Sequence, residues 1–313
     1  MTPQQKAIWL FGGVVVLLVT ASVIGVLLRR RATSDSSRAT ISNLNARVNA
    51  WWVMVAVLAV AFTLGKTATL VMFGFASFFA LREFITLTPT RPGDYLPLLL
   101  SFFVLVPGQY ALIGSGLYGM FAIYIPVYGF LFLPALATLS ADTQDFLERS
   151  AKIQWGVMIA VYCVSYAPAL LLLHIPGYER SNVLLLFYLL LVVQLSDVLQ
   201  YVFGKLWGKT RLAPQVSPSK TVEGLIGGGL SATAVGGAMW WITPFNGWQS
   251  LIMSFVIVIM GFLGGLTLSA VKRSLGAKDW GVMIEGHGGM LDRLDSVSFA
   301  APVFFHLTRY FYT

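Results

Sequence analysis

The chain has 313 residues, of which 57% are hydrophobic and only 11% charged, and its mean hydropathy is +0.76. This composition lies outside the range of soluble domains and predicts an integral membrane protein. The net charge of +8 would indicate a nucleic-acid partner only if a soluble module carried a basic face. No such module remains once the apolar segments are removed, so we expect no nucleic acid. The single cysteine, Cys163, excludes an internal disulfide framework.

Apolar segments that are long enough to cross a bilayer follow one another along the chain, at about 20 residues for ~30 Å of hydrocarbon. The first, at 9–28, is too long for a signal-peptide core and lacks a cleavage site of small residues, so we expect it to be retained as a helix. The others lie roughly at 51–65, 67–82, 96–112, 117–137, 153–173, 183–200, 223–243 and 250–271. The sequence therefore predicts an all-α polytopic membrane protein with about nine transmembrane helices.

Three further stretches complete the predicted layout. The second and third segments meet at Gly65, which leaves a tight hairpin or one broken helix open. Residues 29–47 are rich in Ser, Thr, Asn and Arg and predict a flexible or interfacial loop whose bases contact the headgroups of membrane lipids. The tail at 297–313 predicts a partial span.

The basic residues predict the orientation in the membrane. Of the 21 lysines and arginines, 17 fall in five alternate loops, at 29–50, 82–95, 138–152, 201–222 and 272–296. Cytoplasmic loops carry an excess of Lys and Arg, so we expect these loops to face the cytoplasm and the N-terminus to lie outside. We therefore expect an active site on the cytoplasmic side of a bacterial inner (plasma) membrane.

The first loop that carries chemistry extends from Ser196 to Gly228. Its bases alternate with glycines, and the run Ser217-Pro-Ser-Lys-Thr221 leads into the next helix. Hydroxyls and backbone N–H groups at a helix start bind anions, and Lys220 adds a point charge, so the pattern predicts a phosphate site. The alternative is an ordinary inside loop in which a hydroxyl caps the helix and Glu223 occupies its first turn.

The second loop, from 272 to 296, places acids beside bases in a chain that has few charges. The bases are Lys272, Arg273, Lys278 and Arg293, and the acids are Asp279, Glu285, Asp292 and Asp295. Asp292 and Asp295 are spaced i, i+3, which on a helix puts their Cβ atoms about 5–6 Å apart and suits a shared divalent cation. Hard oxygen ligands beside Lys and Arg are what a Mg²⁺–triphosphate site requires. The alternative is a set of surface ion pairs at the level of the lipid headgroups.

Together the two loops resemble the signature of the CDP-diacylglycerol synthases, also called phosphatidate cytidylyltransferases. Residues 269–296 match S-x-x-K-R, K-D, G-H-G-G, D-R and D at the spacings of that family. Upstream, Asp197 and Tyr201 precede G-K and then S-P-x-K-T-x-E-G-x-x-G-G. The resemblance covers about 100 residues, from Asp197 to Ser296, and residues 78–84 also look similar to the family.

Three positions depart from the family pattern. Gly265 stands where the family carries an acid, in a G-D-L step seven residues before the Lys of K-R, and that acid looks like a metal ligand. Glu285 replaces the usual proline, and Gln200 replaces a small residue. The missing acid leaves two outcomes open, which are a loss of activity and a shift of the metal to Asp197, Asp279 or Glu285.

The resemblance implies transfer of the cytidylyl group of CTP to phosphatidate, with Mg²⁺ as the cofactor and pyrophosphate as the second product. It implies a catalytic region at 183–313, after N-terminal transmembrane helices with a cytoplasmic loop at 1–95 and central transmembrane helices at 96–182. Asp292 is the first candidate for the metal ligand, followed by Asp279, Asp295 and Asp197. The residues implied to hold the triphosphate and the lipid phosphate are Lys272, Arg273, Lys278, Arg293, Ser217, Lys220, Thr221, Gly288 and Gly289.

Several alternatives stay open at this point. His287 could donate to a phosphate oxygen or shuttle a proton, or it could simply pin its loop to a carbonyl group. The acceptor could be another lipid phosphate, and the chain could be a catalytically silent homologue or a lipid-phosphate transporter. Acids within the spans would favour transport, but they are nearly absent. The sequence also leaves a homodimer open.

Overall fold

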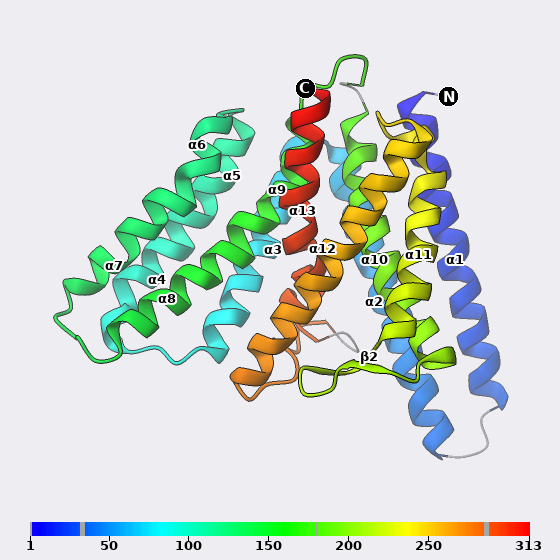
Figure 1. Cartoon of the computed structure of the whole chain (residues 1–313), viewed down its shortest axis with the longest axis horizontal. Helices are drawn as coiled ribbons and strands as arrows, with labels where there is room; N and C mark the ends of the chain where they lie inside the picture. The colour runs from blue at the N-terminus through cyan, green and yellow to red at the C-terminus, as the bar shows by residue number, and fades with distance from the viewer. Residues whose placement is uncertain (1, 32–34, 179–180, 285–287) are drawn as a thin grey trace.

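The computed structural model describes residues 2–31, 35–178, 181–284 and 288–313, and most of these residues are helical (Figure 1). The α-helices are α1 (Pro3–Arg31), α2 (Asp35–Leu64), α3 (Lys66–Leu87), α4 (Tyr95–Leu100), α5 (Val106–Gly114), α6 (Tyr118–Ile123), α7 (Phe130–Thr138), α8 (Phe146–Val157), α9 (Val164–Ala169), α10 (Asn182–Trp207), α11 (Val222–Ala238), α12 (Gly247–Ser274) and α13 (Leu291–Tyr312).

Shorter elements connect these helices. The π-helical turns η2 (Ser101–Leu105), η3 (Tyr124–Gly129) and η4 (Met158–Cys163) join α4 to α5, α6 to α7 and α8 to α9. The 3₁₀ turns are η1 (Pro92–Asp94), η5 (Leu170–Leu172) and η6 (Trp240–Ile242). The strands β1 (Arg211–Ala213) and β2 (Ser217–Thr221) form an antiparallel hairpin that pairs Arg211 with Thr221.

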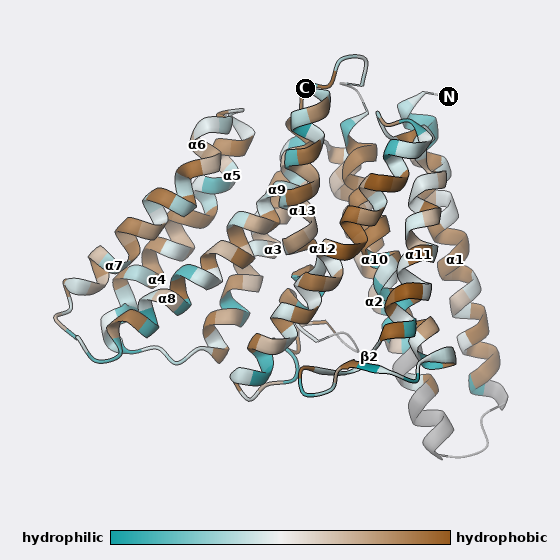
Figure 2. Ribbon diagram, in the orientation of Figure 1, coloured by the Kyte–Doolittle hydropathy of each residue, from teal (hydrophilic) through white to brown (hydrophobic). Residues whose placement is uncertain are grey.

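Within the described residues, eight helical segments are long and apolar enough to cross a membrane. They are Pro3–Arg29, Asn45–Leu64, Lys66–Leu87, Pro92–Gly114, Tyr118–Thr138, Phe146–Leu172, Asn182–Trp207 and Gly247–Ser274. Figure 2 shows hydrophobic residues along the length of these helices and hydrophilic residues mainly near their ends. The chain is therefore an all-α polytopic integral membrane protein, as its composition predicts. The span predicted at 223–243 is the shorter helix α11, which has 17 residues.

The base-rich connections gather at one end of the helix bundle. In Figure 1 the end of α1, the start of α2 and the connections from α3 to η1 and from α7 to α8 all lie at the lower end, together with β2 and the end of α12. Both chain termini lie at the upper end. The described parts of the five loops that the charge pattern groups together thus share one end of the molecule, which we call the basic end.

One expectation from the sequence is wrong, the extent of the C-terminal helix is defined, and one open choice is settled. Most of 29–47, expected to be a loop, belongs to α1 and α2, because extending an existing helix is much easier than nucleating one. The tail from 297, expected to be a partial span, forms most of the 22-residue helix α13, which runs to the upper end (Figure 1). The second and third segments form a hairpin of α2 and α3, and Gly65 has the positive φ of 95° that the sharp turn needs.

Glycines bring the helices of the C-terminal half into backbone contact. A Cβ at Gly228 on α11 would lie 2.3 Å from the backbone nitrogen of Gln200 on α10, and one at Gly224 would lie 2.7 Å from the Gln200 carbonyl oxygen. A Cβ at Gly264 on α12 would lie 2.5 Å from the carbonyl oxygen of Asp295 on α13. No larger residue fits at these positions, so the three glycines fix how α10 to α13 approach one another.

The charges of the 82–95 and 138–152 loops form a structural network. Arg149 Nε lies 3.0 Å from Asp94 Oδ1, and Arg149 Nη1 lies 3.0 Å from Asp142 Oδ2. The side chains of Arg149 and Asp94 are only 5% and 2% exposed. Arg91 adds a bond of 2.9 Å from its Nε to Asp142 Oδ2. These residues join the start of α4 to the α7–α8 connection.

Candidate active site

The two loops that the sequence singles out, 196–228 and 272–296, meet at the basic end. They meet around the carboxylates of Asp197 on α10 and Asp295 on α13, which we call the acidic pair. Ser296 Oγ donates a hydrogen bond of 3.0 Å to Asp197 Oδ2, and the Ser296 N–H donates one of 2.7 Å to Asp295 Oδ1. Ser296 thus contacts both acids. The structure thereby brings together two predicted metal ligands that are almost 100 residues apart in the sequence.

Lys220 and Gly265 complete this cluster. A Cβ at Gly265 on α12 would lie 3.1 Å from Lys220 Nζ, 3.3 Å from Ser296 Oγ and 3.7 Å from Asp295 Oδ2. Gly265 stands where the family that the sequence resembles carries an acid, and it therefore lies directly beside the acidic pair. In this chain that position holds no side chain, and the ammonium group of Lys220 lies next to it.

The environment of Lys220 explains why a lysine can be held there. Its Nζ lies 4.6 Å from the ring centroid of Phe262, close enough for a cation–π interaction. Burial lowers the pKa of the Lys220 ammonium below its usual value, although the charges of Asp197 and Asp295 act in the opposite direction. The two carboxylates therefore favour the charged form of Lys220, while its burial away from water disfavours that form.

A second cluster is centred on Asp292, the first residue after the start of α13. Lys272 Nζ donates to Asp292 Oδ1 at 2.6 Å, while the N–H groups of Trp280 and Gly289 donate to Oδ2 at 2.8 and 2.9 Å. The Asp292 side chain is only 5% exposed. Three donors already bind this carboxylate. Through them Asp292 on α13 fixes Trp280 and Gly289 of the connection and pairs with Lys272 on α12, which is a structural role. Its role as a metal ligand stays a prediction.

Asp292 and Asp295 therefore have different partners, although their i, i+3 spacing suggested one shared cation. Asp292 binds Lys272 and the backbone of the connection. Asp295 lies with Lys220, Gly265 and Ser296. Of the predicted metal ligands, Asp197 and Asp295 form the pair whose side chains the structure brings beside the ammonium group of Lys220.

Glu83 on α3 is a residue of the site that sequence reasoning missed. Its Oε1 accepts the N–H of Met290 at 2.8 Å, and its Oε2 accepts the N–H of Leu291 at 2.9 Å. The first N–H groups of a helix have no partner within the helix, and a carboxylate stabilises them. A Cβ at Gly289 would lie 2.3 Å from Glu83 Oε2, so any side chain there would displace the Glu83 carboxylate. The only signal in the sequence was a charged residue in an apolar span, within the weakly similar stretch 78–84.

The remaining residues of the first loop support the hairpin and α11. Thr221 caps α11, because its Oγ1 accepts the Gly224 N–H at 3.1 Å, as the alternative reading of this loop expected. The Glu223 carboxylate accepts the N–H of Lys209 at 3.1 Å and that of Thr210 at 3.1 Å. Ser217 begins β2 and is half-buried. These hydrogen bonds hold β2 in place, and β2 directs the Lys220 side chain toward the acidic pair.

Other predicted residues lie on the surface of the same end. Arg273 is exposed and donates to the carbonyl oxygens of Val216 at 3.3 Å and Ala277 at 3.0 Å, which ties the hairpin to the 275–290 connection. Lys278 and Asp279 are exposed. A Cβ at Gly288, whose φ is +81°, would lie 3.4 Å from the Asp279 Cβ. His287 and Glu285 lie outside the described residues.

The donor set of the acidic pair fits Mg²⁺. This ion keeps several waters and is usually bound through one or two carboxylates together with substrate phosphates. Among the residues that the structure describes, no group of three or more His, Cys, Asp or Glu side chains could hold a metal. Two hard oxygen donors beside Lys220 match a site that substrate phosphates complete.

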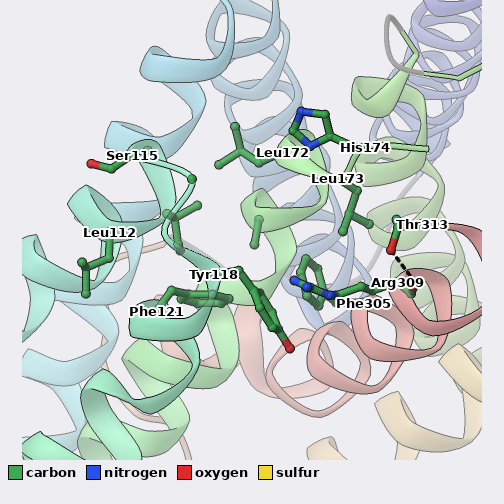
Figure 3. Close-up of a pocket in the computed structure, with 14 residues that line it drawn as sticks. Leu112, Ser115, Tyr118, Phe121, Leu172, Leu173, His174, Phe305, Arg309 and Thr313 are labelled. Carbon is green, nitrogen blue, oxygen red and sulfur yellow. Dashed lines mark hydrogen bonds between the residues drawn. The ribbon is translucent and has the colours of Figure 1, made fainter. Parts of the chain in front are cut away.

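A cavity of about 400 Å³ lies at the opposite end of the bundle, between the α5–α6 connection, η5 and the end of α13. Figure 3 shows its lining, where Tyr118 and Phe305 face Arg309 and where His174 sits at the rim. The guanidinium carbon of Arg309 lies 3.2 Å from the ring centroid of Tyr118. None of the residues predicted for the active site lines this cavity.

Comparison with known proteins identifies the family. The profile of the cytidylyltransferase family matches residues 45–311. The chain belongs to the cytidylyltransferase family. It is a nucleotidyltransferase, and membership implies CTP and a phosphate-bearing lipid as its substrates.

Individual relatives of this cytidylyltransferase cover different shares of the chain. The uncharacterized protein YnbB of Escherichia coli (strain K12) is 36% identical over 297 residues, which are 94% of this chain and 95% of that protein. The phosphatidate cytidylyltransferase of Staphylococcus aureus (strain COL) is 34% identical over 209 residues, 64% of this chain and 78% of that enzyme. That of Staphylococcus haemolyticus is 44% identical over 118 residues, 37% of this chain and 45% of that enzyme.

Proposed function

We propose that this cytidylyltransferase converts CTP and phosphatidate into CDP-diacylglycerol and pyrophosphate, a step of phospholipid biosynthesis. An oxygen of the lipid phosphate attacks the α-phosphorus of CTP and forms the new P–O bond. The bond from that phosphorus to the oxygen bridging to the β-phosphate breaks, and pyrophosphate leaves with the electron pair. A phosphate monoester is already ionised at neutral pH, so the protein needs to position two anions and offset their charge rather than supply a covalent nucleophile.

The observation that carries this proposal is the meeting of both loops at the acidic pair. Lys220 from the first loop and Asp295 from the second lie around the same empty position at Gly265, within a bundle that spans the membrane. Relatives that bear the name phosphatidate cytidylyltransferase support the choice of phosphatidate as the acceptor.

We assign roles to the residues on this basis. Asp197 and Asp295 would hold Mg²⁺, with Asp279 and Asp292 as the further candidates. When bound, the ion offsets charge on the phosphate oxygens. Lys220 sits beside the acids, where it can bind an oxygen of the triphosphate. Further contacts to the triphosphate and the lipid phosphate would come from Arg273, Lys278, Arg293, His287, Ser217, Thr221 and the backbone N–H groups at Gly288 and Gly289. Lys272 would act chiefly through Asp292.

The location of the site completes the proposal. We place the basic end on the cytoplasmic side of a bacterial inner membrane, because positive loops stay inside and CTP is a soluble nucleotide. A homodimer is a further proposal, and the molecular mass of the purified protein in detergent tests it.

A catalytically silent homologue is the second candidate, because Gly265 leaves one position beside the acidic pair without a carboxylate. The test is to incubate purified protein with CTP, Mg²⁺ and a panel of acceptors: phosphatidate, a polyprenyl phosphate and a diacylglycerol. We expect the CDP-lipid, identified by mass spectrometry, to form from phosphatidate and to require Mg²⁺. A product from the polyprenyl phosphate alone would replace the proposed acceptor, and no product from any of the three would support the silent homologue.

A further inference from the structure

The cavity at the end of the bundle opposite to the basic end has no part in the proposed function. Its volume of about 400 Å³ lies within the ~300–1,000 Å³ typical of ligand pockets. Residues of the α5–α6 connection, of η5 and of α13 line it (Figure 3). We call it the Arg309 cavity, after the arginine in its wall. Its location and its charge both restrict what it can bind.

The Arg309 cavity lies at the level where lipid headgroups meet the protein. The membrane-spanning segments Pro92–Gly114, Tyr118–Thr138 and Phe146–Leu172 each begin or end at a residue that lines it. The hydrocarbon of a bilayer extends between the ends of such segments, and the headgroups lie just beyond it. A molecule in this cavity is therefore surrounded by headgroups, which on the proposed orientation are those of the outer leaflet.

The guanidinium group of Arg309 is held in the cavity with its N–H groups free of protein acceptors. Its central carbon lies 3.2 Å from the ring centroid of Tyr118, and that ring stacks on Phe305. An arginine near a helix end usually extends its head to water, whereas this one is turned onto the aromatic pair (Figure 3). Among the described residues, no carbonyl oxygen or carboxylate accepts a hydrogen bond from this side chain. Stacking occupies the face of the guanidinium, so the N–H groups in its plane stay available to a ligand.

The rest of the lining favours an anion that carries an apolar part. None of the described lining residues is acidic. His174 adds a ring nitrogen at the rim, while Leu112, Phe121 and Leu172 provide apolar wall. A planar guanidinium group binds phosphate oxygens through paired N–H donors. A zwitterionic headgroup would bring an ammonium group into a lining that offers it no carboxylate.

We propose that the Arg309 cavity binds the headgroup of an anionic phospholipid such as phosphatidylglycerol, with its phosphodiester at Arg309 and its glycerol against the apolar wall. This inference does not depend on the proposed function, because none of the residues assigned to the reaction lines the cavity. A free phosphate ion shares the charge and the hydrogen-bond acceptors of this headgroup. The apolar wall and the position at the level of the headgroups favour the lipid.

Photo-crosslinking in vesicles tests the proposal. The full-length protein, without CTP, is placed in phosphatidylcholine vesicles that contain a small fraction of phosphatidylglycerol with a diazirine on its headgroup. We expect labelled peptides from 112–121 and 169–174, and we expect unlabelled phosphatidylglycerol, but not inorganic phosphate, to displace the probe. A phosphatidylcholine probe with a headgroup diazirine, at the same fraction, should label these peptides much less. Equal labelling by both probes would overturn the proposal, and displacement by inorganic phosphate would replace the lipid by a free anion.

Two pairs of variants test whether the label depends on this cavity. Arg309→Gln removes the proposed phosphate ligand, whereas Lys66→Gln removes an exposed cation that does not line the cavity. Because charged hydrogen bonds are lost, we expect Arg309→Gln to lower the labelling by about tenfold or more, and Lys66→Gln to leave it unchanged. Leu172→Trp narrows the cavity and should also reduce the label, whereas Leu117→Trp, at an exposed position outside the lining, should not. Thermal unfolding shows which variants are folded, and wild-type labelling in a folded Arg309→Gln or Leu172→Trp variant would refute the site.

Discussion

Replacing Asp292 by asparagine tests whether this carboxylate holds the 275–290 connection or binds the metal. An amide offers one carbonyl oxygen, which cannot replace both oxygens of the carboxylate. In the wild type, Oδ1 accepts Lys272 at 2.6 Å, and Oδ2 accepts the N–H groups of Trp280 and Gly289. An amide NH₂ would therefore face either the ammonium or two N–H donors.

The expected magnitude follows from the burial of this ion pair. The side chains of Lys272 and Asp292 are 10% and 5% exposed, and removing one partner of a buried pair costs about 3–5 kcal/mol. At about 2 °C per kcal/mol for a chain of this size, the apparent Tm should fall by roughly 6–10 °C. Asp279→Asn is the matched control, because Asp279 is exposed and its loss should change Tm by only about 1 °C.

The assay combines thermal unfolding in detergent with Mg²⁺ titration of the residual activity. For Asp292→Asn we expect the lower Tm and a reduced kcat, with the Mg²⁺ concentration for half-maximal activity unchanged. For Asp295→Asn we expect a Tm close to that of the wild type and a Mg²⁺ requirement raised by about tenfold or more. A variant Asp292→Asn with wild-type Tm and a strongly raised Mg²⁺ requirement would refute this reasoning and restore Asp292 as the metal ligand.

Three further predictions concern neighbouring positions. Glu83→Gln keeps one carbonyl oxygen for the two N–H groups at the start of α13, so it should lower stability by about 1.5–3 kcal/mol and reduce kcat more than it raises the KM for CTP. Thermal unfolding and steady-state kinetics check this, and an unchanged kcat would contradict it. Gly265→Asp places a carboxylate beside Lys220 and Asp295 and should lower the Mg²⁺ concentration for half-maximal activity; a titration in which neither this value nor the rate changes would contradict it. Asp94→Asn leaves the buried Arg149 with Asp142 as its remaining carboxylate partner and should lower stability by about 1.5–3 kcal/mol in a denaturation experiment with the KM for CTP unchanged, and full stability would show that the network does not stabilise the fold.

The sequence predicts the general architecture well because hydropathy and charge are local properties. Apolar runs locate the spans, and the bases locate the end at which the loops gather. Local properties also mislead at element ends. The Ser- and Arg-rich stretch after residue 31 reads as a loop, yet most of it extends α2. The tail after residue 297 reads as a partial span, whereas α13 already begins at Leu291, inside the charged loop.

For the site, too, the sequence predicts what local patterns encode and misses what depends on how the helices pack. The two loops could be linked from the sequence because their residue types and spacings resemble one family. Whether Asp292 or Asp295 joins Asp197 depends on side-chain directions at the start of α13, and i, i+3 spacing cannot decide that. Glu83 could not be found, because its partners are backbone N–H groups about 207 residues away along the chain.

The central claim is that this site joins the α-phosphate of CTP to a lipid phosphate. It is tested most directly by following labelled phosphate from CTP into the lipid phase, with purified wild type and the folded Asp295→Asn variant. With the wild type, phosphatidate and Mg²⁺, we expect label from α-³²P-CTP to enter the lipid and label from γ-³²P-CTP to stay in the water as pyrophosphate. At the Mg²⁺ concentration that gives the wild type half its maximal rate, Asp295→Asn should transfer much less α-label. Entry of the γ-label into the lipid, or no entry of the α-label with the wild type, would contradict the account.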